Sequence, residues 1–345
     1  MDNAILILHG GLLSTVQDGG RFGYMQYGIP PAGAMDKFSM NIANLLVGND
    51  ANAAVIETCY LGPHLLFQCD ETISITGAQA NVTINDQPVS MWHSLQVQKG
   101  DVLKMEPVSA GLYNYIAFSR GLDVPLVMGS KSTYLPSKLG GLHGRKLQAD
   151  DVISLGEIKK EVPQRMLRKE RIPVFSKERT LRVLLGPQDN HFTGIGIDTF
   201  FNSVYTITSA SDRMGYRLDG PPLEHKKGAD IISDGTSHGS IQVPGNGLPI
   251  ILLSDRGTTG GYTKIATVIA KDICALAQMP PGSRVRFQAI SAQDANARYR
   301  SFFGQLEDQL ITIGEPEFSA KNEKVFHVQV DGRSFHVTLR QQSKK

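Results

Sequence analysis

Short β-like runs separated by turn residues constrain this chain more than any other feature of its sequence. Segments 72–76, 81–84 and 95–97 alternate apolar with polar residues, and turn sequences follow at Asn85-Asp86 and Lys99-Gly100-Asp101. Further strands are expected at 112–118, 152–155, 181–185, 203–208, 250–253 and 285–289. This spacing is typical of barrels or sandwiches and not of a parallel sheet with crossover helices. We therefore expect a mainly β fold with a few peripheral helices.

Three segments show helical periodicity, and the tail predicts a hairpin. Asp36 is expected to cap a helix that runs to about Leu46, and segments 264–278 and 292–310 each carry an apolar face. Near the end, runs 325–330 and 334–339 flank Asp331-Gly332, a strong signature of a type I′ turn. We expect this hairpin to pack on the edge of a barrel.

The length of 345 residues predicts two domains, because single hydrophobic cores stop growing at roughly 250–300 residues. A stretch rich in Lys and Arg, with few large apolar residues, marks the boundary. Such a run serves as a nucleic-acid or partner patch in some proteins, but a solvated linker is the interpretation we favour. The predicted division is a first domain at 1–160, a basic linker at 161–180 and a second domain at 181–345.

Composition argues against several classes of protein. The net charge of +2 gives no support for nucleic-acid binding, and no run approaches the roughly 20 apolar residues of a membrane span. The three cysteines are odd in number and lie in apolar or strand-like surroundings, which suits a reducing compartment and not a disulfide framework. We expect a cytoplasmic protein that binds neither nucleic acid nor membrane.

Several common catalytic signatures are missing from the sequence. The nine histidines show no metal-ligand spacing, so no metal site is expected. The segment 129–133 resembles a phosphate loop but lacks the glycines of that pattern, and no Gly-x-Ser-x-Gly elbow occurs. Lys104 lacks the sequence context of a biotinylated lysine, so no covalent biotin is expected.

Two glycine- and hydroxyl-rich loops, 209–220 and 254–262, each contain an Asp-Arg pair. Arginine forks and glycine amides suit a carboxylate or a phosphate, although self-paired Asp-Arg contacts in ordinary loops are the alternative. The expected anion-binding residues are Arg213, Arg217, Arg256, Arg145, Arg21, Thr259, Gly260 and Tyr262.

Three aspartates are candidates for a catalytic role. Asp212 and Asp255 are expected to orient the neighbouring arginines, with a role as bases the less favoured alternative. Asp36 is a candidate general base if the helix start places it at the mouth of a cleft, and a plain helix cap otherwise.

Several ordered motifs resemble the carboxyltransferase-domain family once labelled allophanate hydrolase subunit 2. The matching segments are Val16-Gln-Asp-Gly-Gly-Arg-Phe-Gly, Gly33-Ala-Met-Asp36, 44–49, 57–63, 140–145, 211–217 and 258–262. The resemblance covers about residues 14–290. It implies two cyclophilin-like β-barrel domains that face each other across a cleft.

The activity implied by this resemblance is that of the stand-alone bacterial members, the ATP-dependent opening of 5-oxo-L-proline to L-glutamate. These members share the reaction with partner subunits A and B, so we expect this chain to be inactive alone. One alternative is a regulatory protein that antagonises an inhibitor of a sporulation histidine kinase, and that inhibitor itself resembles the second of these partners. Another alternative is carboxyl transfer with a separate biotin carrier, as in the urea amidolyase relatives.

Overall fold

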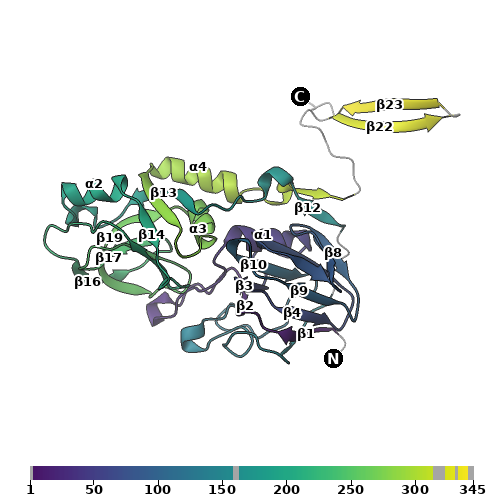
Figure 1. Ribbon diagram of the computed structural model, residues 1–345, viewed down its shortest axis with the longest axis horizontal. Helices are drawn as coiled ribbons and strands as arrows, with labels where there is room; N and C mark the ends of the chain where they lie inside the picture. The colour runs from purple at the N-terminus through teal and green to yellow at the C-terminus, as the bar shows by residue number, and fades with distance from the viewer. Residues whose placement is uncertain (1–2, 158–162, 314–322, 331–332, 341–345) are drawn as a thin grey trace.

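The computed structural model describes residues 3–157, 163–313, 323–330 and 333–340. Two β systems lie side by side along the long axis of the molecule, one built from the first half of the chain and one from the second (Figure 1). Four α-helices accompany them in the described residues. The predicted fold class, mainly β with barrel units and a few helices, is confirmed, and every predicted strand overlaps an observed one.

The strands of the first half pair as two antiparallel sheets around one core. A six-stranded sheet has the order β11-β1-β4-β9-β6-β7, and a five-stranded sheet has the order β2-β3-β10-β5-β8. Apolar side chains from both sheets, such as Ile5, Phe67, Ile75 and Phe118, are buried between them. The strands are β1 (Ala4–His9), β2 (Leu13–Gln17), β3 (Val55–Cys59), β4 (His64–Phe67), β5 (Glu71–Gln79), β6 (Val82–Ile84), β7 (Gln87–Pro88), β8 (Ser94–Val97), β9 (Val102–Met105), β10 (Ala110–Phe118) and β11 (Val152–Ser154).

The second half forms a closed barrel of seven strands in the order β13-β20-β14-β15-β18-β17-β19, closed by pairing of β19 with β13. An additional strand, β16, pairs with β19 outside this ring. The strands are β13 (Glu178–Leu185), β14 (Tyr205–Ile207), β15 (Gly215–Asp219), β16 (Asp230–Gly235), β17 (Ser240–Val243), β18 (Ile250–Leu252), β19 (Thr259–Val268) and β20 (Arg284–Ala289).

Three of the four helices pack together beside the sheets. The helices are α1 (Lys37–Leu46), α2 (Gly194–Asn202), α3 (Ala270–Ala277) and α4 (Ala292–Phe303). As predicted, Asp36 caps α1, and its carboxylate accepts a hydrogen bond from the Ser39 amide at 3.1 Å. Phe38 of α1 stacks on Phe302 of α4, with ring centroids 4.6 Å apart, and Cys274 of α3 joins the same cluster.

Two sequence-based predictions are wrong in part. The predicted helix 264–278 is a strand up to Val268, and α3 begins only at Ala270. The predicted linker contains a short strand, β12 (Arg165–Leu167), which pairs with β21 (Leu310–Thr312), and Leu167 is buried against α1 and α4. This segment is therefore attached to the fold by a strand and an apolar contact, where we expected a solvated connection.

The predicted tail hairpin forms from β22 (Glu323–Val330) and β23 (Arg333–Arg340), with Val330 opposite Arg333. Its turn residues 331–332 lie outside the described residues. The hairpin is a two-stranded sheet of its own, so the expected packing as an edge of the barrel is not found.

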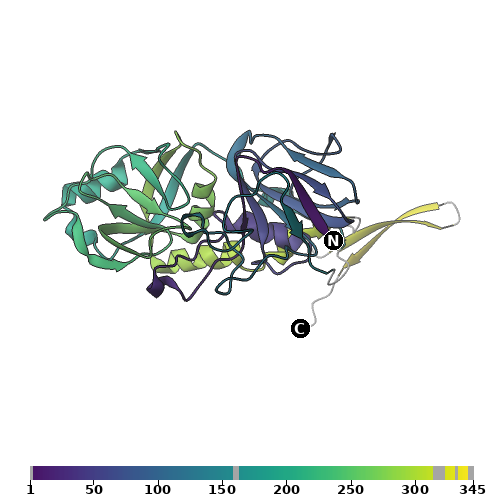
Figure 2. The same ribbon diagram turned by 90° about the horizontal axis from the view of Figure 1, so that it is seen from below.

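The two halves meet through one continuous hydrophobic cluster (Figure 2). Met40 and Tyr115 of the first half share this cluster with Leu181, Tyr216 and Ile265 of the barrel, and all five are buried. The junction is therefore a packed core, and polar groups within it need partners of their own.

None of the described helices combines the length and the apolar composition that a membrane crossing needs. The three cysteines, Cys59, Cys69 and Cys274, are free thiols.

Candidate functional site

Arg213 is the polar anchor of the junction. Its Nε and Nη2 atoms donate to the two carboxylate oxygens of Asp255 at 2.9 and 3.0 Å, and Nη1 donates to Glu57 on β3. Nη2 also donates to the carbonyl oxygen of Gly33 at 2.7 Å. Burial alone would lower the pKa of Arg213, but the carboxylates of Asp255 and Glu57 outweigh it and raise the pKa above its ordinary value. The guanidinium thus binds protein groups of both halves and holds the halves together.

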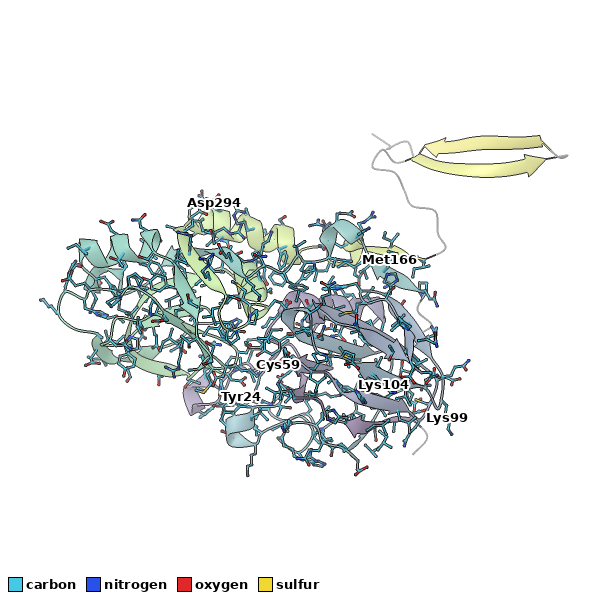
Figure 3. All side chains as sticks on the ribbon, in the orientation of Figure 1. Tyr24, Cys59, Lys99, Lys104, Met166 and Asp294 are labelled. Carbon is cyan, nitrogen blue, oxygen red and sulfur yellow. The ribbon has the colours of Figure 1, made fainter. Side chains whose placement is uncertain are left out.

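Glu57 is a central residue that the sequence motifs do not single out. It is buried in β3, and its Oε2 atom accepts a hydrogen bond from the Met35 amide at 2.7 Å. This bond fixes the segment that leads into α1. The available signal is a carboxylate in the middle of the apolar strand Val55–Cys59, where an unpaired charge would be very costly. Cys59, at the end of the same strand, marks the junction in Figure 3.

Arg256 occupies the matching position in the second Asp-Arg loop, but its surroundings are different. It is only 6% exposed, and its polar contacts are long bonds to the carbonyl oxygens of Thr236 and Leu253, at 3.4 and 3.3 Å. In the described part of the chain, no carboxylate lies within salt-bridge distance of this guanidinium. Burial accordingly lowers the pKa of Arg256. It is a buried cation without a counter-charge.

Lys37 and His238 lie close to Arg256. The Lys37 amine donates to the carbonyl oxygen of Gly19 at 3.1 Å, and burial together with the charge of Arg256 lowers its pKa. The Nε2 atom of His238 is buried and has no hydrogen-bond partner among the described residues. Burial and the positive charges of Arg256, Lys37 and Arg213 lower the pKa of His238 to about 3, so its ring is neutral at pH 7.

A cavity of about 730 Å³ opens beside Lys37 and His238. Its lining includes the apolar side chains of Met35, Leu45 and Ile273, and it is bordered by the exposed residues Glu307 and Asp308. We refer to Lys37, His238 and Arg256 as the cation cluster and to this space as the junction cavity. The sequence motifs predict Arg256 but miss Lys37 and His238, which stand outside any recognisable pattern.

Arg21 lies in the N-terminal glycine-rich loop and is also fully buried. Its Nε and Nη2 atoms donate to the carbonyl oxygens of Val127 and Ser132 at 3.0 and 2.9 Å, while Nη1 has no partner among the described residues. Burial lowers its pKa, and the charges of Asp18 and Asp255 oppose that shift. Arg21 therefore lies within reach of the charges of the junction.

The loop that resembles a phosphate loop is filled by a protein carboxylate. Asp18 accepts hydrogen bonds from the Ser130 hydroxyl at 2.7 Å and from the Lys131 amide at 2.6 Å, and Ser132 also donates to it. These donors hold the loop against the N-terminal segment. They are therefore not available to a phosphate.

Four of the predicted residues lie apart from the cation cluster. Asp212, Arg217, Thr259 and Tyr262 line a separate hollow of about 790 Å³ on the second half. Asp212 accepts bonds from the amides of Met214 and Gly215 at 2.8 and 3.2 Å, so it shapes its own turn. The expectation that Asp212 orients Arg213 is wrong, because Asp255 does so.

Gly260 is needed for close packing. A Cβ atom at this position would lie 2.1 Å from the Nε2 atom of Gln242, so a side chain has no room there. This contact is a structural reason for the glycine, separate from the predicted anion binding.

Asp36 borders a small cavity of about 170 Å³, but its carboxylate is already engaged. It accepts bonds from the Ser39 amide and hydroxyl and, at 2.9 Å, from Nε2 of Gln278. Burial raises the pKa of Asp36, against the bonds from Gln278 and Ser39, which lower it. The contacts are those of a helix cap joined to α3.

Arg145 and Lys104 lie away from the junction. Arg145 forms a two-pronged pair with Asp151, with distances of 2.7 and 2.6 Å, and is not brought near Arg256. Lys104 lies in β9 and pairs with Asp86 at 2.7 Å, far from Cys59 in Figure 3. Among the described residues, no group of three or more His, Cys, Asp or Glu side chains is arranged to hold a metal ion.

Comparison with known proteins gives consistent matches. The family described as carboxyltransferase domain, subdomain A and B, matches residues 27–289. The chain is 38% identical to the C subunit of 5-oxoprolinase from Escherichia coli over 84% of its own length and 92% of that protein, and 38% identical to the corresponding 5-oxoprolinase protein of Haemophilus influenzae over 82% and 90%. The crystal structure of the Kluyveromyces lactis urea carboxylase superposes with a TM-score of 0.81 at 28% identity, covering 98% of this chain and 32% of that one.

Proposed function

The chain belongs to the carboxyltransferase-domain family, and we propose that it is one subunit of an ATP-dependent 5-oxoprolinase that converts 5-oxo-L-proline to L-glutamate with subunits A and B. The observation that carries this proposal is its similarity, over nearly the full length of both proteins, to two bacterial proteins that bear the name of the C subunit of 5-oxoprolinase. Membership of such a complex also accounts for a chain that has a buried cation cluster but lacks a recognisable nucleophile or phosphate loop.

The chemistry of lactam opening suits the donors at the junction. The lactam is too stable to open without activation, so ATP phosphorylates its carbonyl oxygen, and water then attacks the activated carbon and releases phosphate and L-glutamate. The substrate carries a carboxylate and the activated species a phosphate. Buried Arg and Lys donors stabilise such groups strongly, because little water competes with them.

We place no ATP site on this chain, since the donors of the loop 129–133 are occupied by Asp18. We also propose that the chain acts without covalently bound biotin, because Lys104 is paired within a strand. Its three free cysteines fit the reducing environment of the cytoplasm, where we place the complex.

The test is reconstitution. Subunits A and B are purified with and without this chain, and glutamate formation from 5-oxo-L-proline and ATP is measured. We expect turnover only when all three are present, and none from this chain alone. Full turnover of subunits A and B in its absence, or steady turnover by the single chain, would refute the assignment.

Carboxyl transfer is a second candidate, favoured by the superposition of 98% of this chain on a urea carboxylase. In that case the junction donors would bind the carboxyl group delivered by a separate biotin carrier protein. Incubation of the chain with a carboxylated carrier and urea, using labelled bicarbonate, tests it. Label that stays on the carrier excludes this candidate.

A further inference from the structure

We infer that the junction cavity is a receptor for a small organic oxyanion, whose carboxylate or phosphoryl group is bound by Lys37, His238 and Arg256. The receptor follows from the geometry of this chain, and only the identity of its natural ligand rests on the proposed function. Neither the family description nor the names of the relatives assign such a site to these residues.

The first argument is the missing counter-charge. Arg256 is buried with two long carbonyl contacts, and Lys37 donates to one carbonyl oxygen. The nearby Asp18 is committed to Ser130 and Lys131. Buried charges in folded proteins are normally paired, so an unpaired set indicates a group that arrives from outside.

The second argument is the contrast with Arg213 in the same junction. That guanidinium is satisfied by Asp255, Glu57 and the carbonyl oxygen of Gly33. The fold therefore places carboxylates beside a buried arginine where it serves structure. It leaves Arg256, one residue after Asp255, without such a partner.

The third argument is the orphaned ring nitrogen of His238. Its Nε2 atom has no partner among the described residues, and a neutral ring with a proton on Nε2 can donate to an anion oxygen. Buried polar atoms without partners are rare and point to an ion or water that completes them. His238 lines the same cavity as Lys37, so one oxyanion can reach both.

The remaining lining sets the class of ligand. The cavity of about 730 Å³ is much larger than a single phosphate, and Met35, Leu45 and Ile273 supply apolar surface. Glu307 and Asp308 are exposed at its border and would repel a second negative charge on the ligand's far end. The site therefore suits a compact anion with an apolar body, a description that 5-oxo-L-proline meets.

Calorimetric titration of the full chain tests this inference, with inorganic phosphate and 5-oxo-L-proline as separate probes. We expect Arg256→Met and Lys37→Met to weaken binding at least about tenfold, the loss of one charge-assisted hydrogen bond. Lys226→Met and Arg217→Met are the matched controls, because both residues are exposed and away from the cavity. Binding of 5-oxo-L-proline but not phosphate identifies a carboxylate receptor, and the reverse identifies a phosphoryl receptor.

Folding of each variant is checked by its thermal midpoint, since removal of an unpaired buried charge should leave the midpoint unchanged or raise it. Binding of both probes by Arg256→Met as tight as by the unaltered chain overturns the inference, as does failure of the unaltered chain to bind either probe. A loss confined to Arg217→Met would place the site in the other hollow and also overturn it. None of these results depends on glutamate formation, so a failed reconstitution leaves the receptor standing.

Discussion

At the scale of single residues, Arg213 and Arg256 show how one sequence pattern serves two purposes. Each follows an aspartate in a loop of similar composition, and both side chains are 6% exposed. Arg213 ends on two carboxylates, whereas Arg256 ends on two distant carbonyl oxygens. The first contributes to stability, and we assign ligand binding to the second.

Replacing Arg213 by lysine should destabilise the fold. Lysine keeps the charge but cannot reach Asp255 and Glu57 together, so one buried carboxylate loses its donor. We expect the free energy of unfolding to fall by about 1–3 kcal/mol, measured by denaturant titration. Arg217→Lys, at an exposed position, is the control and should change it little. An Arg213→Lys chain as stable as the unaltered one would contradict the structural role.

His238 should make stability depend on pH. Its pKa is about 3 in the folded chain and about 6.5 when unfolded, so the unfolded state binds the proton first as pH falls. Its contribution is complete above about pH 6.5 and is lost toward pH 3, at up to about 1.4 kcal/mol per pH unit. Unfolding of His238→Gln should show a shallower loss between pH 6.5 and 4.5. Equal slopes for the two chains would show that the ring is not held neutral.

The candidate site is predictable only where a motif marks it. The Asp-Arg pattern leads to Arg213, Arg256 and Asp255, and the structure brings all three to the junction. Lys37 and His238 cannot be found in this way, because their importance comes from what surrounds them after folding. Arg145 and Asp212 carry a similar local signal, yet they are engaged elsewhere.

At the scale of elements, the start of α1 joins the two halves. The carboxylate of Asp36 caps the helix and also accepts from Gln278, whose Oε1 atom accepts the amides of Leu112 and Tyr113 in β10. One side chain thus connects α1 to the end of α3, and through Gln278 to the five-stranded sheet. The cap is therefore part of the junction and not only a local feature.

Substitution of Asp36 separates capping from catalysis. Asp36→Ala should lower the free energy of unfolding by at least about 1 kcal/mol, while Asp36→Asn, which retains a capping oxygen, should lower it less. If Asp36 is only a cap, the Asn variant keeps its turnover in the reconstituted enzyme. Stability is read from denaturant titration and turnover from glutamate release. A stable Asn variant without turnover would restore the general-base interpretation.

Strand positions are largely predictable, because alternation and turn residues survive in half-buried strands. The failure at 264–278 has a physical cause. β19 is flanked by β13, β16 and β17, and its residues 263–266 are all buried, so apolar positions do not alternate there. Even Lys264 is buried, with its amine on Asp234 at 3.0 Å. A run buried on both faces resembles a wide helical face, so its pattern merges with that of α3.

At the scale of the whole molecule, the shared core predicts that the halves unfold together. Met40 and Tyr115 pack with barrel residues, and Arg213 joins Glu57 to Asp255 across the junction. Separate domains with a small polar interface would melt independently. Scanning calorimetry should give a single transition for the full chain. Two resolved transitions would show that the junction core contributes little to stability.

Turnover of the three-subunit enzyme with Arg256→Met is the most direct test of the central claim, that the cation cluster at the junction binds the reacting anion. We predict that kcat/KM for 5-oxo-L-proline falls about 10- to 150-fold, the range for one lost charge-assisted hydrogen bond, while assembly and thermal midpoint are retained. Arg217→Met serves as the matched control and should keep full turnover. Undiminished turnover of the Arg256→Met enzyme would contradict the claim.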